Sequence, residues 1–275
     1  MANMIAIYAL AILASTAYAI ALSLIGIHLA ARDRSMQALC AGQGAMFGTL
    51  VGIGLVQQFS EILENVAPFI TAAIGSMLAF FLSEKFVGKK KSSRNTYFIA
   101  IFSILVAFSH LVSCIFPSLE SHMAQRYFGD LATMSTQEGK VIIAVAILSL
   151  IFLFARCKAL TRESFDSAIL GYESLISPSF FGIIALVVIA LSVQVLGFLF
   201  TMSCLFLPTA FAAHGNRSGL WQHIIFCILI AGVSTALGFI LSLYVSHAPT
   251  VPVIVLTMLM MGVGTSGLSR WKVFG

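Results

Sequence analysis

Long apolar runs alternate with short charged clusters along this chain. No Asp, Glu, Lys or Arg occurs in 1–31, 35–60, 65–83, 95–119 or 141–155, and Arg217 is the one formal charge between Glu173 and Arg270. A helix needs ~20 apolar residues to cross ~30 Å of hydrocarbon, and the runs lack the alternation of barrel strands. The pattern predicts an all-α, polytopic integral membrane protein. About eight transmembrane helices with short re-entrant segments are expected, near 4–31, 36–57, 65–83, 96–116, 140–156, 178–207, 222–244 and 251–268.

The positions of the lysines and arginines predict the orientation of these spans. Bases gather in the loops after the first, third and fifth spans, and basic loops face the cytoplasm. We therefore expect cytoplasmic loops at 32–35, 84–95 and 156–177, and an amino terminus outside. The loop after the second span carries Glu61 and Glu64 and no base. The carboxyl tail, with Arg270 and Lys272, would also fall outside, which fits the rule badly.

The composition supports a membrane protein and argues against other classes. Hydrophobic residues make up 60% of the chain and charged residues 9%. The net charge of +5 comes from loop bases, which orient the protein and meet anionic lipid headgroups, so no nucleic-acid partner is expected. The sequence contains no GxxxxGK[ST], HExxH, GxSxG or CxxC motif. We expect one transmembrane domain over 1–275 that binds no cofactor itself.

The loop at 156–177 has a pattern of its own. Glu163 and Asp166 would lie in the first turn of a short helix, where acids favour the positive end of the dipole. Ser164 could cap that helix, and Gly171 could end it. An exposed amphipathic helix between two spans suits contact with a cytoplasmic partner, although an ordinary structured loop would also explain the pattern.

Four segments carry a family resemblance. They are Tyr127–Ser135 (YFGDLATMS), the spacing Glu163, Ser167 and Gly171, Gly197–Ala212 (GFLFTMSCLFLPTAFA), and Tyr244–Leu256 with Pro249 and Pro252. In this order, over about residues 20 to 265, they resemble the permease subunits of the manganese, zinc and iron ABC importers, the ABC-3 family. Ser167 stands where the family usually has alanine, and Val251 replaces a family glycine.

The resemblance implies a transport subunit of a bacterial cytoplasmic (inner) membrane importer, and not an enzyme. Helix 162–172, with Glu163, Asp166, Ser167 and Gly171, would be the coupling helix that docks on a separate cytoplasmic ATPase, which binds the ATP. A second permease subunit, identical or homologous, and an extracytoplasmic solute-binding protein would complete the assembly. The substrate would be a divalent transition metal: manganese, zinc or iron.

The second span departs from the family pattern. Family members carry an aspartate and a histidine four residues apart there, a pair that suits transition metals. This chain has Leu39 and Gln43 at those positions. Gln43 would form either an interhelical hydrogen bond or a neutral contact along the transport path. Glu61 and Glu64 share one helical face at the outer mouth, where they could attract cations or contact a binding protein. They could equally lie on a solvated loop face.

Two prolines are expected to break helices beside a cavity. Pro208 and Pro249 would build short re-entrant segments, because broken backbone at membrane depth must be satisfied by protein or water. The six histidines are scattered without ligand spacing, so most are expected to be structural.

Three other functions compete with import of a metal ion. A permease for a metal chelate or another small solute would explain the missing Asp–His pair. An energy-independent channel or secondary carrier would favour inverted repeats and intramembrane charges, and we see neither in the sequence. An intramembrane enzyme would need convergent polar groups within the spans, where only single histidines and serines occur.

Overall fold

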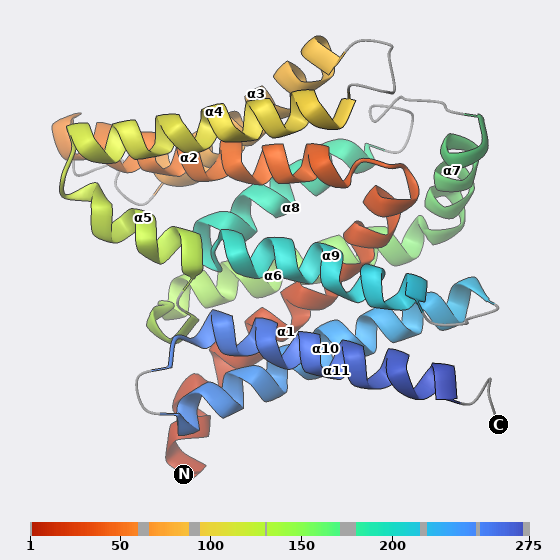
Figure 1. The fold of residues 1–275 in the computed structure, drawn as a ribbon. Coiled ribbons are helices and arrows are strands. Elements are labelled where there is room, and N and C mark those ends of the chain that lie inside the picture. Colours follow the sequence, from red (N-terminus) through yellow and green to blue (C-terminus); the bar gives the residue numbers. More distant parts are fainter. Residues whose placement is uncertain are drawn as a thin grey trace. The chain divides into compact units, whose positions relative to one another are not determined.

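The computed structural model describes residues 2–59, 66–87, 94–129, 131–170, 180–214, 219–245 and 248–271. Every regular element in these ranges is a helix (Figure 1). In chain order the helices are α1 (Ala2–Ala31), α2 (Ser35–Phe59), α3 (Ala67–Val87), α4 (Arg94–Ile115), α5 (Leu119–Phe128), the 3₁₀ turn η3 (Leu131–Thr133), α6 (Thr136–Ala155), α7 (Cys157–Leu170), α8 (Phe181–Val195), α9 (Phe198–His214), α10 (Leu220–Tyr244) and α11 (Thr250–Trp271).

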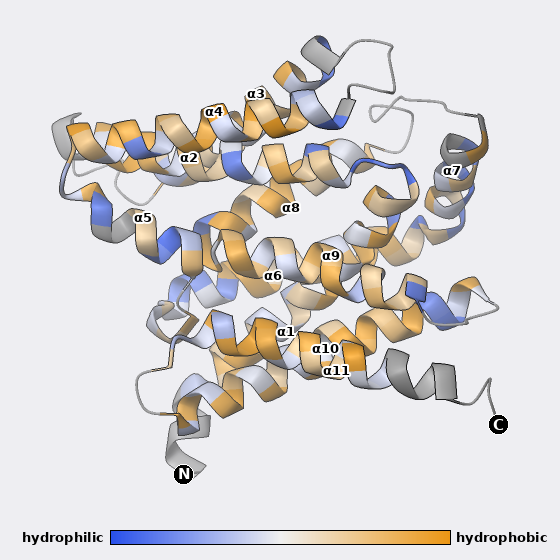
Figure 2. Ribbon diagram, in the orientation of Figure 1, coloured by the Kyte–Doolittle hydropathy of each residue, from blue (hydrophilic) through white to orange (hydrophobic). Residues whose placement is uncertain are grey.

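Most of these helices are suited to a bilayer. Six are long and apolar enough to cross it: Tyr8–Ala31, Ser35–Val56, Ala67–Lys85, Asn95–Ile115, Thr136–Ala155 and Leu220–Tyr244. Three shorter apolar helices cover Phe181–Val195, Phe198–His214 and Thr250–Thr265. Figure 2 shows hydrophobic residues along these helices, and hydrophilic residues gathered on α5 and α7. The predicted all-α, polytopic membrane fold is confirmed.

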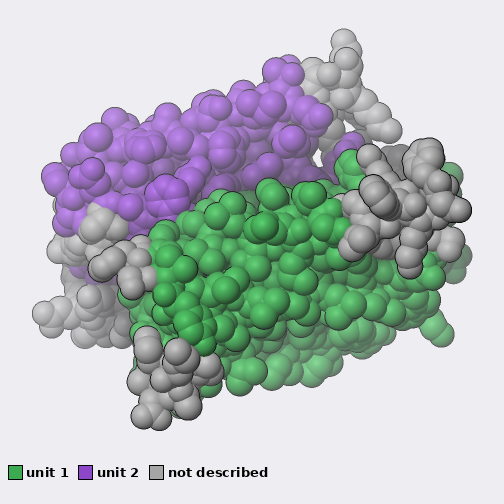
Figure 3. Space-filling view, turned by 60° about the horizontal axis from the view of Figure 1, so that its bottom comes forward, with its two compact units in different colours: residues 1–32, 130–173, 199–275 green, residues 33–129, 174–198 purple. Residues whose placement is uncertain are grey.

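The chain forms two compact units (Figure 3). Unit 1 comprises residues 1–32, 130–173 and 199–275, and unit 2 comprises 33–129 and 174–198. The expectation of one domain over 1–275 stays a prediction.

In unit 2, α2 is the central helix and packs against α3, α4 and α8. Its contact with α3 is very close. A Cβ atom at Gly75 would lie 2.2 Å from the carbonyl oxygen of Gly44, and one at Gly48 would lie 2.1 Å from that of Thr71. Membrane helices use small residues in this way, because association depends on close backbone packing. Glycine therefore fixes the crossing of α2 and α3.

In unit 1, α1 packs against α6 and α10, and α10 packs against α11. The last two helices are antiparallel, because Gly238 lies against Ile254 whereas Ser234, one turn earlier in α10, donates a hydrogen bond to Met261 Sδ at 3.4 Å. Helix α6 begins with a capping box, in which the Ser135 hydroxyl and the Glu138 carboxylate each accept the other residue's backbone N–H.

The segment 178–207, predicted as one span, is two helices. Helix α8 ends at Val195 and α9 begins at Phe198. Between them Gly197 has a φ of +95°, and a Cβ there would lie 2.6 Å from the Cα of Gly129. Only glycine tolerates both conditions. The guanidinium of Arg126 donates to the Gln194 carbonyl, so one of the last carbonyls of α8 is satisfied where the helix stops.

The arrangement of helices in unit 1 bears on the side at which α11 ends. Within unit 1, a cavity of about 540 Å³ is lined by Ala31 of α1, Phe165 of α7, Ala213 of α9 and Leu220 of α10, so the end of α9 lies with α7. Helix α10 starts there, and the antiparallel α11 returns to the same side. Within unit 1, α11 therefore ends on the side of α7, whereas the count of eight spans places its end on the opposite side.

Candidate functional site

A buried polar cluster joins the end of α1 to the middle of α7. Arg32 Nε donates a hydrogen bond to Ser164 Oγ at 3.1 Å, and Arg32 Nη2 donates to Glu163 Oε2 at 3.3 Å. His28 Nδ1 lies 3.1 Å from Ser164 Oγ, so the hydroxyl that accepts from Arg32 can donate its own proton to His28. The Arg32 side chain is only 4% exposed. A guanidinium is buried at acceptable cost only when it is paired, so these contacts fix α7 to α1.

The opposite face of α7 is exposed and partly apolar. Phe165 and Ile169 are 66% and 68% exposed, and their spacing of four puts them on one face. Arg162 and Asp166 are also exposed, whereas Leu160, one turn before Ser164, is fully buried. Exposed apolar side chains of this kind can mark a surface that contacts a partner.

The structure corrects the predicted details of this helix. The helix begins at Cys157 and not near residue 162, so residues 157–161 belong to it as well. Glu163 and Asp166 therefore lie in the middle of α7, and Ser164 is no cap but bonds to His28 and Arg32. Ser167 lies in α7, and Gly171 lies outside the described residues.

Sequence reasoning missed the roles of His28 and Arg32. The sequence pattern predicts Arg32 to be an orienting loop base and His28 to be one of several scattered structural histidines. The available signal was their spacing of four at the end of the first apolar run, which puts an imidazole and a guanidinium on one helical face.

The second-span position Gln43 is fully buried in unit 2. Its Nε2 donates a long hydrogen bond of 3.4 Å to Ser109 Oγ on α4, so the interhelical bond exists. Its Oε1 has no hydrogen-bond partner in the structure. A buried carbonyl oxygen without a donor is costly, and this oxygen is therefore a candidate contact for water or substrate. Leu39, one turn earlier, is half-buried.

A second buried polar pair in unit 2 was not predicted. Thr49 of α2 donates a hydrogen bond to Gln194 Oε1 of α8 at 2.7 Å. The structure does not join this pair to Gln43, since Gln43 bonds to α4 and Thr49 to α8. Gln194 was visible in the sequence as the one amide side chain in the run 181–207.

The remaining predicted positions do not form a site. Glu61 and Glu64 lie outside the described residues. Helix α9 runs through Pro208, so the break expected there lies instead at Gly197. Pro249 is exposed and directly precedes α11, where a missing N–H costs little. Among the described residues, no three His, Cys, Asp or Glu side chains come together as metal ligands.

The sequence and the fold were compared with known proteins. The sequence matches the ABC 3 transport family over residues 4–266, and a search of the curated proteins finds no match. The structure is similar to PsaBC from Streptococcus pneumoniae, solved in complex with Fab, with a TM-score of 0.72, 18% identity and coverage of 92% of this chain and 88% of that chain. It is also similar to an inward-facing metal-chelate type ABC transporter, with a TM-score of 0.66, 18% identity and coverage of 95% and 85%.

The two structural similarities establish a shared fold, and the family match covers nearly the whole sequence. The chain belongs to the ABC 3 transport family and is a membrane-embedded permease, the transport subunit of an ABC importer.

Proposed function

We propose that this chain is the permease of a binding-protein-dependent importer of a divalent transition metal in the bacterial cytoplasmic membrane. ATP would bind to a separate cytoplasmic ATPase, and a second permease subunit and an extracytoplasmic binding protein would complete the complex. Membership of the ABC 3 transport family supports this assembly.

Helix α7 is the segment that would receive the ATPase. The observation that carries this role is the division of α7 into two faces. One face is bonded to α1 through Arg32, and the other exposes Phe165 and Ile169. A helix that transmits a conformational change from the ATPase must be fixed to a transmembrane helix on one face. Its other face must be accessible to the ATPase. Helix α7 meets both requirements within unit 1.

A metal chelate is the second candidate substrate. The observation that favours it is the neutrality of the buried polar groups Gln43, Thr49 and Gln194 in unit 2. A carboxamide oxygen is a weaker ligand for a transition metal than an Asp–His pair. A bare divalent ion inside a bilayer also needs compensating charge. A bare ion would therefore require ligands from the second permease subunit or from another span, whereas a chelate brings its own.

ATP hydrolysis by the reconstituted complex tests the substrate. The complex, with its binding protein, is supplied with each first-row divalent ion as the free ion and as a chelate. We expect a free ion to stimulate hydrolysis in the presence of the binding protein, and no stimulation when the binding protein is left out. If no free ion stimulates hydrolysis and a chelate does, the chelate proposal replaces the first. If neither does, both are wrong.

A further inference from the structure

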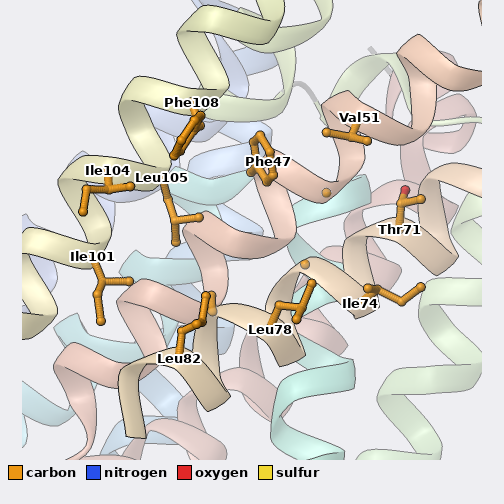
Figure 4. Close-up of a pocket in the computed structure, with 13 residues that line it drawn as sticks. Phe47, Val51, Thr71, Ile74, Leu78, Leu82, Ile101, Ile104, Leu105 and Phe108 are labelled. Atoms are coloured by element: carbon orange, nitrogen blue, oxygen red, sulfur yellow. The ribbon is translucent and has the colours of Figure 1, made fainter. Parts of the chain in front are cut away.

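An apolar groove in unit 2 lies between α3 and α4, with α2 as its floor. Its volume is about 480 Å³. Helices α3 and α4 both pack extensively on α2 but touch each other little, which leaves the space between them open. Figure 4 shows the α4 side chains Ile101, Leu105 and Phe108 facing those of α2 and α3 across this groove.

The chemistry of the lining excludes a polar ligand. Thr71 has the one polar side chain among the lining residues, and its hydroxyl is bonded to the carbonyls of Ala67 and Pro68 in its own helix. The groove also lies within three candidate membrane spans. Its occupant is therefore a hydrocarbon chain or an apolar helix.

One end of the groove is basic. Leu78, Leu82 and Lys85 are spaced by four and three residues on α3, so they lie on one helical face, and the first two line the groove. Lys85 is exposed. The neighbouring acid, Glu84, is 2.8 Å from Arg34, so it is engaged away from Lys85. The following loop adds Lys89, Lys90 and Lys91 in the sequence.

We propose that this groove binds the acyl chain of an anionic phospholipid of the cytoplasmic leaflet, with its phosphate near Lys85. A cluster of bases directly cytoplasmic of a span attracts anionic headgroups, and the apolar groove receives the chain attached to them. A second copy of this permease is the competing occupant. A symmetric pair of copies joined through this groove would bring the two Lys85 side chains to the same side of the membrane, where like charges repel.

Quenching by brominated lipids tests the site in the full-length chain, purified in the complex in which it assembles. With Trp221 and Trp271 replaced by Phe, one tryptophan is introduced as Ile104→Trp in the groove. Ile99→Trp is the matched control, because Ile104 and Ile99 lie on different faces of α4 and are 54% and 55% exposed. Vesicles contain either brominated phosphatidylglycerol or brominated phosphatidylcholine in an unbrominated phosphatidylcholine background.

We expect the affinity of the quenching site at Ile104→Trp to be at least about fivefold higher for brominated phosphatidylglycerol than for brominated phosphatidylcholine. One base near the membrane surface favours an anionic lipid by about this factor. We expect a ratio near one at Ile99→Trp. Lys85→Ala should lower the ratio at Ile104→Trp and leave that at Ile99→Trp unchanged. Equal quenching by both lipids at Ile104→Trp would overturn the proposal, as would an unchanged ratio in Lys85→Ala. Failure of either lipid to quench would show that protein covers the groove.

Discussion

The backbone N–H of Leu131 donates a hydrogen bond to the Thr250 hydroxyl at 3.1 Å. This bond joins the start of α11 to the turn that precedes α6. Helix α6 leads from that turn to α7, so α11 begins at the end of unit 1 opposite to α7. Helix α11 then ends on the side of α7, which the base asymmetry predicts to be the cytoplasmic side.

Cysteine labelling checks this topology. In a cysteine-free background, Ser92→Cys and Val273→Cys should react with a membrane-impermeant maleimide in inside-out vesicles, and Ser60→Cys should react in intact cells. The physical reason is that, within unit 1, α10 starts on the side of α7 and the antiparallel α11 returns to that side. Labelling of Val273→Cys together with Ser60→Cys from outside would contradict the arrangement.

The Arg32 cluster should be needed for coupling. Arg32→Ala removes hydrogen bonds to Ser164 and Glu163, a loss of about 1.5–3 kcal/mol for bonds to a charged group. The equilibrium constant for the attachment of α7 to α1 should therefore fall about tenfold or more. We expect the amount transported per ATP hydrolysed to fall, while the permease stays inserted in the membrane. Uptake and ATP hydrolysis in proteoliposomes measure this ratio.

Arg34→Ala is the control for that experiment. It breaks a similarly buried pair with Glu84, with side chains 5% and 35% exposed, and both residues belong to unit 2, whereas α7 belongs to unit 1. We expect Arg34→Ala to keep the wild-type ratio of transport to hydrolysis. An equal fall in both variants would assign the Arg32 effect to general loss of structure.

The close crossing of α2 and α3 should be sensitive to one methyl group. In Gly75→Ala the new Cβ would lie 2.2 Å from the Gly44 carbonyl oxygen, and overpacking of this kind costs about 1–3 kcal/mol. Thermal unfolding in detergent should therefore begin at a lower temperature. Gly264→Ala in α11 has no atom within 4 Å of the added Cβ and should be neutral or slightly stabilising. A stable Gly75→Ala protein would argue against this packing.

The second span should accept a metal site. Leu39→Asp with Gln43→His puts a carboxylate and an imidazole four residues apart on α2, a donor set that suits transition metals. The purified complex of the double variant should bind Mn²⁺ or Zn²⁺ more tightly than the wild type in equilibrium dialysis, and Gln43→His alone should bind less tightly than the pair. Equal binding by all three would mean that these two positions do not face the same accessible space.

The spans could be predicted because each is a local property of the sequence. Twenty apolar residues define a crossing whatever surrounds them. The spans predicted near 96–116 and 222–244 agree with the helical segments Asn95–Ile115 and Leu220–Tyr244. The break at Gly197 could not be found by hydropathy, since residues 181–207 are mostly apolar and carry no charge on either side of it. It depends on the approach of Gly129, nearly seventy residues away in the sequence.

The predicted helix break at Pro208 was wrong for a physical reason. Pro208 is expected to end a helix, but membrane helices tolerate proline where neighbouring groups satisfy the freed backbone, and α9 continues through it to His214. The α7 cluster shows the same limit. The sequence indicated an exposed helix, but the partner of Ser164 is a histidine 136 residues away, which no local pattern specifies.

Site-specific photo-crosslinking tests most directly whether α7 receives the ATPase. A benzophenone amino acid is placed at Phe165 of α7 and, as the control, at Leu148 within the α6 span; the two side chains are 66% and 67% exposed. The complex is irradiated in membranes, and adducts are identified by mass. The account predicts a permease–ATPase adduct from Phe165 and none from Leu148. No ATPase adduct from Phe165 in a complex that still co-purifies with its ATPase would contradict it.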